Sequence, residues 1–189
     1  MIKLYHCDIS KMTDEEFEKL YFRSEASRRK KAKRLKNQPD KKLSIAAGEL
    51  VRQAISEEFN IDKNDIRFRV NKGGKPYTES VKAEFSISHS KDIAVCAISD
   101  RPVGIDIEYM RNVNIDVAKK YFTENEQKYV FEKPKLSNQR FFEIWTKKEA
   151  YVKLYGKGIP YFKEFSVIGN ENIETYIRGN YVVSVAKTK

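Results

Sequence analysis

Apolar and polar positions recur along this chain with two different periods, which predict helices and strands in both halves. Apolar residues return every three to five positions across residues 43–59, the spacing that lines one side of a helix. A shorter helix is expected to begin at Thr13, because Thr13 and Glu16 form the capping-box pattern of a helix start. These features predict helices that pack through an apolar face.

Strand-like alternation follows the helical segments of the first half. Residues 66–70 alternate apolar and basic side chains, and turn-forming residues interrupt the pattern across residues 72–77. Residues 85–88 and 93–98 read as two further strands, joined by a tight turn at residues 90–92. A hairpin is the simplest arrangement of these two strands.

The second half repeats this layout after a break at Asp100, Arg101 and Pro102, because proline resists continuation of the preceding strand. The alternation in Val103–Tyr109 is the clearest strand signal in the chain. We expect helices at about 115–121, 124–131 and 138–155, and strands at 165–168, 173–177 and 181–186. The prediction is an α+β fold with an N-terminal lobe (1–101) and a C-terminal lobe (102–189), each a small antiparallel sheet packed with helices.

Composition adds limits to this picture. Two fifths of the 189 residues are hydrophobic, enough for a packed core, and no apolar run approaches the roughly 20 residues that span a bilayer. The first residues read as a strand and not as a signal peptide, so we expect a soluble cytoplasmic protein without a membrane partner. Cys7 and Cys96 lie far apart and outside any CxxC pair, which predicts reduced cysteines.

The net charge of +10 indicates polyanionic partners. Much of the excess lies in a dense basic block from Arg28 to Arg34. Such a block can be a solvated helix face, a nucleic-acid patch, or a binding surface for phosphorylated cofactors or acidic proteins. Charge alone leaves these alternatives open.

Two acids in the strand Val103–Tyr109 suggest a cation site. Asp106 and Glu108 lie on the strand face opposite the apolar residues, about 7 Å apart, on the side where Gly104 leaves space. Hard cations prefer carboxylate oxygens, and two neighbouring acids repel unless a cation neutralises them. A solvent-exposed acidic strand face explains the same pattern.

An acid and an amine in the segment 138–155 extend this idea. Glu149 and Lys153 are four residues apart, so they are neighbours on the helix surface. An intrahelical ion pair is the plain interpretation of this spacing. Combined with Asp106 and Glu108, however, the two residues could supply a Mg²⁺ site and a proton carrier of the kind that phosphoryl chemistry needs.

Two further residues are candidates for phosphate contact. His89 lies at the end of a strand and at the mouth of a turn, where its ring could reach a ligand phosphate, although structural histidines are common. Lys75 lies in a Gly-Gly-Lys-Pro turn, whose glycines permit close approach of a ligand. The spacing of a phosphate-binding P-loop is absent from this turn.

Four blocks, in this order and spacing, resemble the signature of the 4′-phosphopantetheinyl transferases of the surfactin-synthetase-activating type. They are Gly74-Lys75-Pro76, Phe85-Ser86-Ile87-Ser88-His89-Ser90, Val103-Gly104-Ile105-Asp106-Ile107-Glu108, and the run from Trp145 to Lys153. The resemblance extends over nearly the whole chain. It implies a pseudo-twofold, two-lobed α+β monomer that binds coenzyme A between its lobes.

The resemblance also implies roles for individual residues. Asp106, Glu108 and Glu149 would hold Mg²⁺, and Glu149 would act as the base, directly or through water. Lys153 would contact the phosphates and stabilise the leaving 3′,5′-ADP. The implied coenzyme contacts are Arg28, Lys31 and His89 at the 3′-phosphate, and Lys75 and Ser88 elsewhere.

The implied partner is an apo acyl- or peptidyl-carrier protein or domain, docking at residues 121–131, and nucleic acid is not expected. Two other functions fit part of the pattern. Charge and acid pairs suit a Mg²⁺-dependent nuclease, and the basic block suits a nucleic-acid-binding module without catalysis. Both leave the block from Phe85 to Ser90 and the block from Trp145 to Lys153 unexplained.

Overall fold

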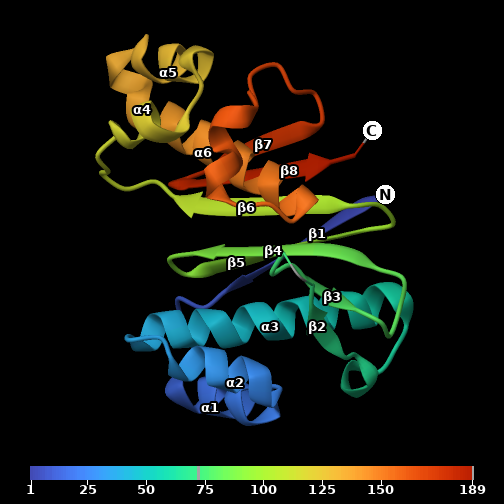
Figure 1. Cartoon of the computed structure of the whole chain (residues 1–189). Helices are drawn as coiled ribbons and strands as arrows, with labels where there is room; N and C mark the ends of the chain where they lie inside the picture. Colours follow the sequence, from blue (N-terminus) through green and yellow to red (C-terminus); the bar gives the residue numbers. More distant parts are fainter. Residues whose placement is uncertain (72, 189) are drawn as a thin grey trace.

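The computed structural model describes residues 1–71 and 73–188, so Lys72 of the expected turn and Lys189 lie outside the described residues. Helices and small sheets form two lobes, one above the other in Figure 1. The lower lobe contains β1 (Ile2–Asp8), α1 (Asp14–Arg23), α2 (Ala26–Lys33), α3 (Gln38–Phe59), a 3-10 helix (Lys63–Asp65), β2 (Phe68–Val70), β3 (Pro76–Thr78), β4 (Glu84–Ser90) and β5 (Ile93–Ser99).

One long helix covers the sheet of the lower lobe. The sheet is antiparallel in the order β1-β5-β4, and β2 pairs separately with β3. Helix α3 begins with Asn37 as its N-cap, whose side chain accepts a hydrogen bond from the Asp40 N–H group. Its apolar side buries Leu43, Ala47, Leu50 and Ala54 against β5, as the sequence spacing predicts.

The upper lobe repeats the arrangement with a second long helix. It contains β6 (Val103–Tyr109), α4 (Val117–Tyr121), α5 (Glu124–Phe131), a 3-10 helix (Pro134–Leu136), α6 (Ser137–Tyr155), a 3-10 helix (Ile159–Glu164), β7 (Ile173–Arg178) and β8 (Tyr181–Lys187). The sheet is antiparallel in the order β6-β8-β7, and α6 packs on β6 and β8. The predicted α+β fold with two lobes is therefore confirmed, while the boundary between 101 and 102 stays a prediction.

The lobes meet where β4 lies beside β6 (Figure 1). Three serines that alternate along β4 bridge the two strands. The Ile105 N–H donates to Ser86 Oγ at 3.1 Å, the Tyr109 N–H donates to Ser90 Oγ at 3.0 Å, and the Ser88 hydroxyl donates to Asp106 Oδ1 at 2.7 Å. Apolar residues of β5, β6 and β8 form a core that both lobes share, which holds the seam together.

One expected element is confirmed by the structure and others differ from it. The expected hairpin is confirmed, with Lys91 in the left-handed conformation at its turn. The expected strand at 165–168 is wrong, because the Val167 N–H donates to Glu126 and the Phe165 carbonyl accepts from Lys148 instead of pairing in a sheet. Phe59, the last residue of the apolar stripe expected across 43–59, is 38% exposed because it stands at the end of α3.

Within the residues described, no helix is long and apolar enough to span a bilayer.

Candidate functional site

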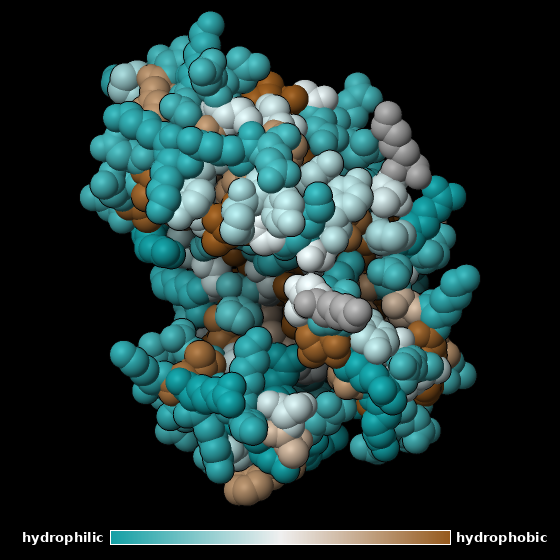
Figure 2. Space-filling view, viewed as in Figure 1, coloured by the Kyte–Doolittle hydropathy of each residue, from teal (hydrophilic) through white to brown (hydrophobic). Residues whose placement is uncertain are grey.

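A cavity of about 490 Å³ lies between the lobes, within the size range of small-molecule sites. Figure 2 shows the hollow between the upper and lower parts of the molecule. Its walls come from α2, α3, the β2–β3 hairpin, β4 and the end of α6. The cationic residues in these walls are Arg28, Lys31, Arg52, Arg69, Lys75, Lys153 and Lys157. The cavity is suited to an anionic ligand.

Helix α2 places two of the predicted phosphate contacts in this wall. Arg28 and Lys31 are three residues apart and therefore share one side of the helix. Desolvation lowers the pKa of Arg28, and desolvation together with the charge of Arg28 lowers the pKa of Lys31. Two cations that are partly stripped of water and repel each other gain from a bound anion.

The β2–β3 hairpin closes another side of the cavity. Lys75 Nζ donates to the Val103 carbonyl at 3.3 Å and lies 3.7 Å from a Glu84 carboxylate oxygen. Gly73 lies so close to the end of α6 that a Cβ there would stand 2.6 Å from the Gly156 carbonyl oxygen. The hairpin of the lower lobe is thus held against the upper lobe beside Lys75.

Asp106 and Lys153 meet beside the cavity, in whose wall Lys153 lies. Asp106 is only 4% exposed, and its Oδ1 accepts hydrogen bonds from Lys153 Nζ at 2.6 Å and Ser88 Oγ at 2.7 Å. Lys153 Nζ also donates to Ser88 Oγ at 2.9 Å. Because Asp106 is buried, the interpretation as a solvent-exposed acidic strand face is wrong. Lys153 of α6 forms its salt bridge with Asp106 of β6, and not with Glu149 of its own helix.

Burial and, after it, like charge raise the pKa values of Glu108 and Glu149. Desolvation and then the charge of Asp106 raise the pKa of Glu149 to about 7, with Glu108 adding to the effect and Lys153 opposing it. Desolvation and Asp106 also raise the pKa of Glu108, although Ser90 donates to its carboxylate at 3.1 Å. Acids from two distant stretches of the chain therefore lie within electrostatic reach of one another.

Gly104 brings the strand and the helix together. A Cβ on this residue would lie 2.0 Å from the Ala150 carbonyl oxygen and 2.6 Å from the Leu154 nitrogen. The sequence led us to expect open space beside Gly104 for a cation; that expectation is wrong, since the backbone of α6 fills it. Close packing at Gly104 is what sets Glu149 and Lys153 beside Asp106.

His89 joins the cationic side of the site while remaining exposed on the strand end. Desolvation, followed by the charges of Lys31 and Lys153 and a smaller effect of Arg28, lowers its pKa. The neutral imidazole is favoured there until an anion compensates these charges. The structure thus gathers His89 with the predicted contacts of α2 and α6.

The carboxylates form no ready-made three-ligand metal site among the described residues. Across residues 1–71 and 73–188, no three His, Cys, Asp or Glu side chains form a cluster that could hold a metal ion. Asp106 Oδ2 is nevertheless buried without a hydrogen-bond partner among those residues. A buried carboxylate oxygen with no donor is a site at which a hard cation fits.

Other residues of the site escaped sequence reasoning. Ser86 and Ser90 bridge the lobes on either side of Ser88, and their two-residue spacing was the available signal. Arg52 of α3 pairs with Glu25 at 2.5 Å in the cavity wall. Because these two residues are 27 positions apart, no local pattern links them.

Fold and site together define a two-lobed α+β protein with a cation-lined cavity beside the buried carboxylate of Asp106. The profile of the 4′-phosphopantetheinyl transferase superfamily matches residues 102–185, and the profile of the 4′-phosphopantetheinyl transferase N-terminal region matches residues 11–101. The chain belongs to the 4′-phosphopantetheinyl transferase superfamily, a family of transferases.

Individual relatives agree with this assignment. The chain is 41% identical over 126 residues to the 4′-phosphopantetheinyl transferase gsp of Aneurinibacillus migulanus, a match covering 65% of this chain and 52% of that protein. It is 33% identical over 150 residues to the 4′-phosphopantetheinyl transferase Sfp of Bacillus subtilis (strain 168), covering 78% of this chain and 67% of the relative. The matched part therefore spans between about half and two thirds of these relatives.

Proposed function

We propose that this protein transfers the 4′-phosphopantetheine group of coenzyme A to a serine of an apo acyl- or peptidyl-carrier protein, releasing 3′,5′-ADP. The observation that carries the proposal is the salt bridge between Asp106 and Lys153, a residue of the cation-lined cavity, with Glu149 within electrostatic reach of both. Membership of the transferase superfamily supports the same reaction class.

The cationic walls would bind the coenzyme through its phosphates. Arg28, Lys31 and His89 would hold the 3′-phosphate, and Lys75 and Ser88 would make further contacts. In support of this, the pKa values of Arg28, Lys31, Lys75 and His89 are all lowered, chiefly by desolvation. A polyphosphorylated ligand would relieve that unfavourable state of the cations.

The carboxylates suit a magnesium ion. Asp106, Glu108 and Glu149 offer the oxygen ligands that Mg²⁺ prefers, and the unpartnered Asp106 Oδ2 supports this fit. When bound, the ion would supply positive charge next to the diphosphate, where negative charge builds during transfer. Since these side chains do not yet form a three-ligand cluster, they would have to draw together around the ion.

The residues of α6 would manage the proton and the leaving group. The raised pKa of Glu149, about 7, matches a general base working near neutral pH. Glu149 would accept the proton of the serine hydroxyl, directly or through water, as the serine oxygen forms its bond to phosphorus. Lys153 would donate a hydrogen bond to the phosphate oxygen that leaves with 3′,5′-ADP.

The net charge of +10 would favour an acidic carrier surface. Docking is proposed at residues 121–131, where the exposed side of α5 begins after Thr123. We also propose that the enzyme is a cytoplasmic monomer and that it does not act on nucleic acid.

The test is transfer of label from coenzyme A to a purified apo carrier domain, with Mg²⁺ or with EDTA. We expect Mg²⁺-dependent labelling that falls by about 10²-fold or more in Asp106→Asn and in Glu149→Gln. The control is Lys19→Gln, which removes an exposed cation that lies outside the cavity lining and pairs with Glu15.

Thermal unfolding supplies a second measurement. Mg²⁺ with coenzyme A should raise the Tm of the wild type more than that of Asp106→Asn. Cleavage of nucleic acid without label transfer would contradict the proposal in favour of a nuclease. Labelling that is unchanged by EDTA would contradict the metal assignment alone.

A further inference from the structure

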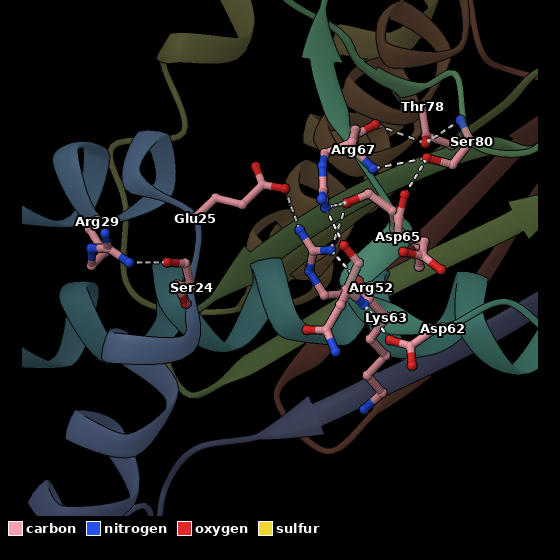
Figure 3. Close-up of polar contacts among 12 residues, drawn as sticks. Ser24, Glu25, Arg29, Arg52, Asp62, Lys63, Asp65, Arg67, Thr78 and Ser80 are labelled. Carbon is pink, nitrogen blue, oxygen red and sulfur yellow. Dashed lines mark hydrogen bonds and ion pairs between the residues drawn. The ribbon is translucent and has the colours of Figure 1, made fainter.

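Three charged residues form a compact group in the wall of the cavity at the start of α2. Glu25 precedes the helix, Arg28 lies within it, and Arg52 reaches them from α3. Arg52 Nη2 lies 2.5 Å from Glu25 Oε1, and Figure 3 shows the Glu25 side chain extended toward Arg52. Glu25 therefore pairs with Arg52, which is farther from it in the sequence than Arg28 is.

Sequence spacing favours a different pairing. Glu25 and Arg28 are three residues apart at a helix start, where an acid and a base are neighbours. Arg28 nevertheless forms no hydrogen bond or salt bridge with any described residue, whereas the Glu25 side chain makes no capping bond and turns to Arg52. Glu25 thus neutralises Arg52 by direct contact and acts on Arg28 only through its field.

Arg52 is anchored so that it can hold the acid. Its Nη1 donates to the Lys63 carbonyl at 2.5 Å and to the Ile66 carbonyl at 2.8 Å, and its guanidinium lies 5.0 Å from the Phe68 ring centroid. The side chain is 15% exposed. A guanidinium fixed by several acceptors offers a stable partner to a carboxylate.

Gly48 makes room for Arg28 next to this pair. A Cβ on Gly48 would stand 2.7 Å from Arg28 Nε, so the Arg28 side chain lies directly across the surface of α3. Arg28 is thereby directed along the cavity wall while Glu25 is occupied elsewhere.

We propose that Arg52 is a positioning residue that engages Glu25, keeps Arg28 available for a phosphate, and so sets the preference for coenzyme A over 3′-dephospho-coenzyme A. This inference rests on the proposed function, which places the 3′-phosphate at Arg28. The formal charge of the group is +1, because two arginines face one glutamate. Freed from Arg52, Glu25 would pair with Arg28 and compete with the phosphate.

A charge cycle separates this role from a structural one. Arg52→Gln leaves Glu25 free beside Arg28, and the group becomes neutral. Arg52→Gln with Glu25→Gln loses the same carbonyl contacts of Arg52, but the group returns to +1. Both variants therefore suffer the same structural damage and differ in the competing carboxylate.

Calorimetric titration of the full chain with coenzyme A and with 3′-dephospho-coenzyme A measures the effect without relying on turnover. We expect Arg52→Gln to weaken binding of coenzyme A by about tenfold and that of the dephospho form by less than about threefold. The double variant should recover most of the loss, and Glu25→Gln alone should bind coenzyme A more tightly than the wild type does.

Further variants distinguish a failure of the role of Arg52 from a failure of the phosphate site at Arg28. Arg69→Gln removes a cavity cation whose partner is Glu79, and it should affect both ligands alike. If the double variant binds coenzyme A as weakly as Arg52→Gln does, the role of Arg52 through Glu25 is wrong. If the wild type shows no preference for coenzyme A, or if Arg28→Ala keeps the preference of the wild type, the proposed phosphate site at Arg28 fails instead.

Discussion

Gly104 in β6 lies directly against the backbone of Ala150 in α6, so that a Cβ on residue 104 would stand 2.0 Å from the Ala150 carbonyl oxygen. This contact sets the distance between the strand that carries Asp106 and the helix that carries Glu149 and Lys153. The salt bridge of 2.6 Å between Lys153 and Asp106 depends on it. One glycine therefore couples the packing of the upper lobe to the geometry of the site.

Gly104→Ala should both destabilise the protein and disable the site. A backbone atom at 2.0 Å cannot move aside as a flexible side chain can, so we expect a loss of about 1–3 kcal/mol in the free energy of unfolding, together with loss of transfer. Urea unfolding followed by circular dichroism checks the stability. Gly158→Ala is the control, because its Cβ would meet Pro160 at an ordinary 3.6 Å. Equal behaviour of the two variants would contradict this account.

The buried pair of Lys148 and Glu126 should be a major support of the upper lobe. Both side chains are fully buried, 2.9 Å apart, and Lys148 also donates to the Phe162 and Phe165 carbonyls. Lys148→Met would leave Glu126 charged and without a cation, with only the Thr123 and Val167 N–H groups as donors among the described residues, at a cost of about 3–5 kcal/mol in unfolding free energy.

Two comparisons test that explanation by chemical denaturation. Adding Glu126→Gln to Lys148→Met should restore part of the stability, because no unpaired charge remains. Lys19→Met, which breaks the exposed pair of Lys19 with Glu15, should change the stability by less than about 1 kcal/mol. A double variant less stable than Lys148→Met would show that the unpaired charge is not the cause.

The stability of the metal-free protein should fall as the pH rises from about 5 to about 8. Glu149 has a pKa of about 7 in the folded state and 4.5 as its ordinary value, since desolvation and Asp106, with Glu108, oppose its ionisation more than Lys153 favours it. The folded state therefore binds more protons between these values, and raising the pH through them lowers the unfolding free energy by roughly 1–3 kcal/mol.

Thermal unfolding across this pH range measures the slope. Glu149→Gln should flatten it, because the substituted side chain does not titrate. Glu164→Gln, an exposed acid of the 3-10 helix, should leave it as in the wild type. A slope that is the same in Glu149→Gln as in the wild type would contradict the assignment.

Gly48→Ala should separate stability from binding. Alanine in the interior of α3 favours the helix by about 0.5–1 kcal/mol over glycine, while its Cβ would displace the Arg28 side chain from 2.7 Å. We expect an unchanged or raised Tm together with weaker binding of coenzyme A, measured by calorimetry. Binding as tight as in the wild type would show that Arg28 does not need this position.

Local patterns predicted most of the helices and strands because each depends on residues close in the chain. The stripe of α3, the capping box at Thr13 and the alternation of β6 each needed fewer than about twenty neighbouring residues. The strand predicted at 165–168 is wrong because local patterns do not report distant partners. Its backbone partners are Glu126 and Lys148, far away in the chain, and no local pattern reports them.

The candidate site divides in a similar way. The residue types at Asp106, Glu108, Glu149 and Lys153 were recognisable from their spacing and from the family resemblance. Their pairing was not: helical spacing suggested Glu149 with Lys153, whereas Lys153 binds Asp106. Likewise, helix spacing would pair Glu25 with Arg28, whereas Glu25 binds Arg52.

Periodicity, turn residues and composition were enough to predict the α+β class, most of the helices and strands, the cationic character of the chain and the residue types of its candidate groups. Packing of α6 on Gly104, of β4 on β6 and of α2 on α3 decided which of those groups meet and which lose contact with water. The physical reason is that side-chain spacing along an element follows backbone geometry, while ion pairing and desolvation depend on neighbours that only the folded chain brings together.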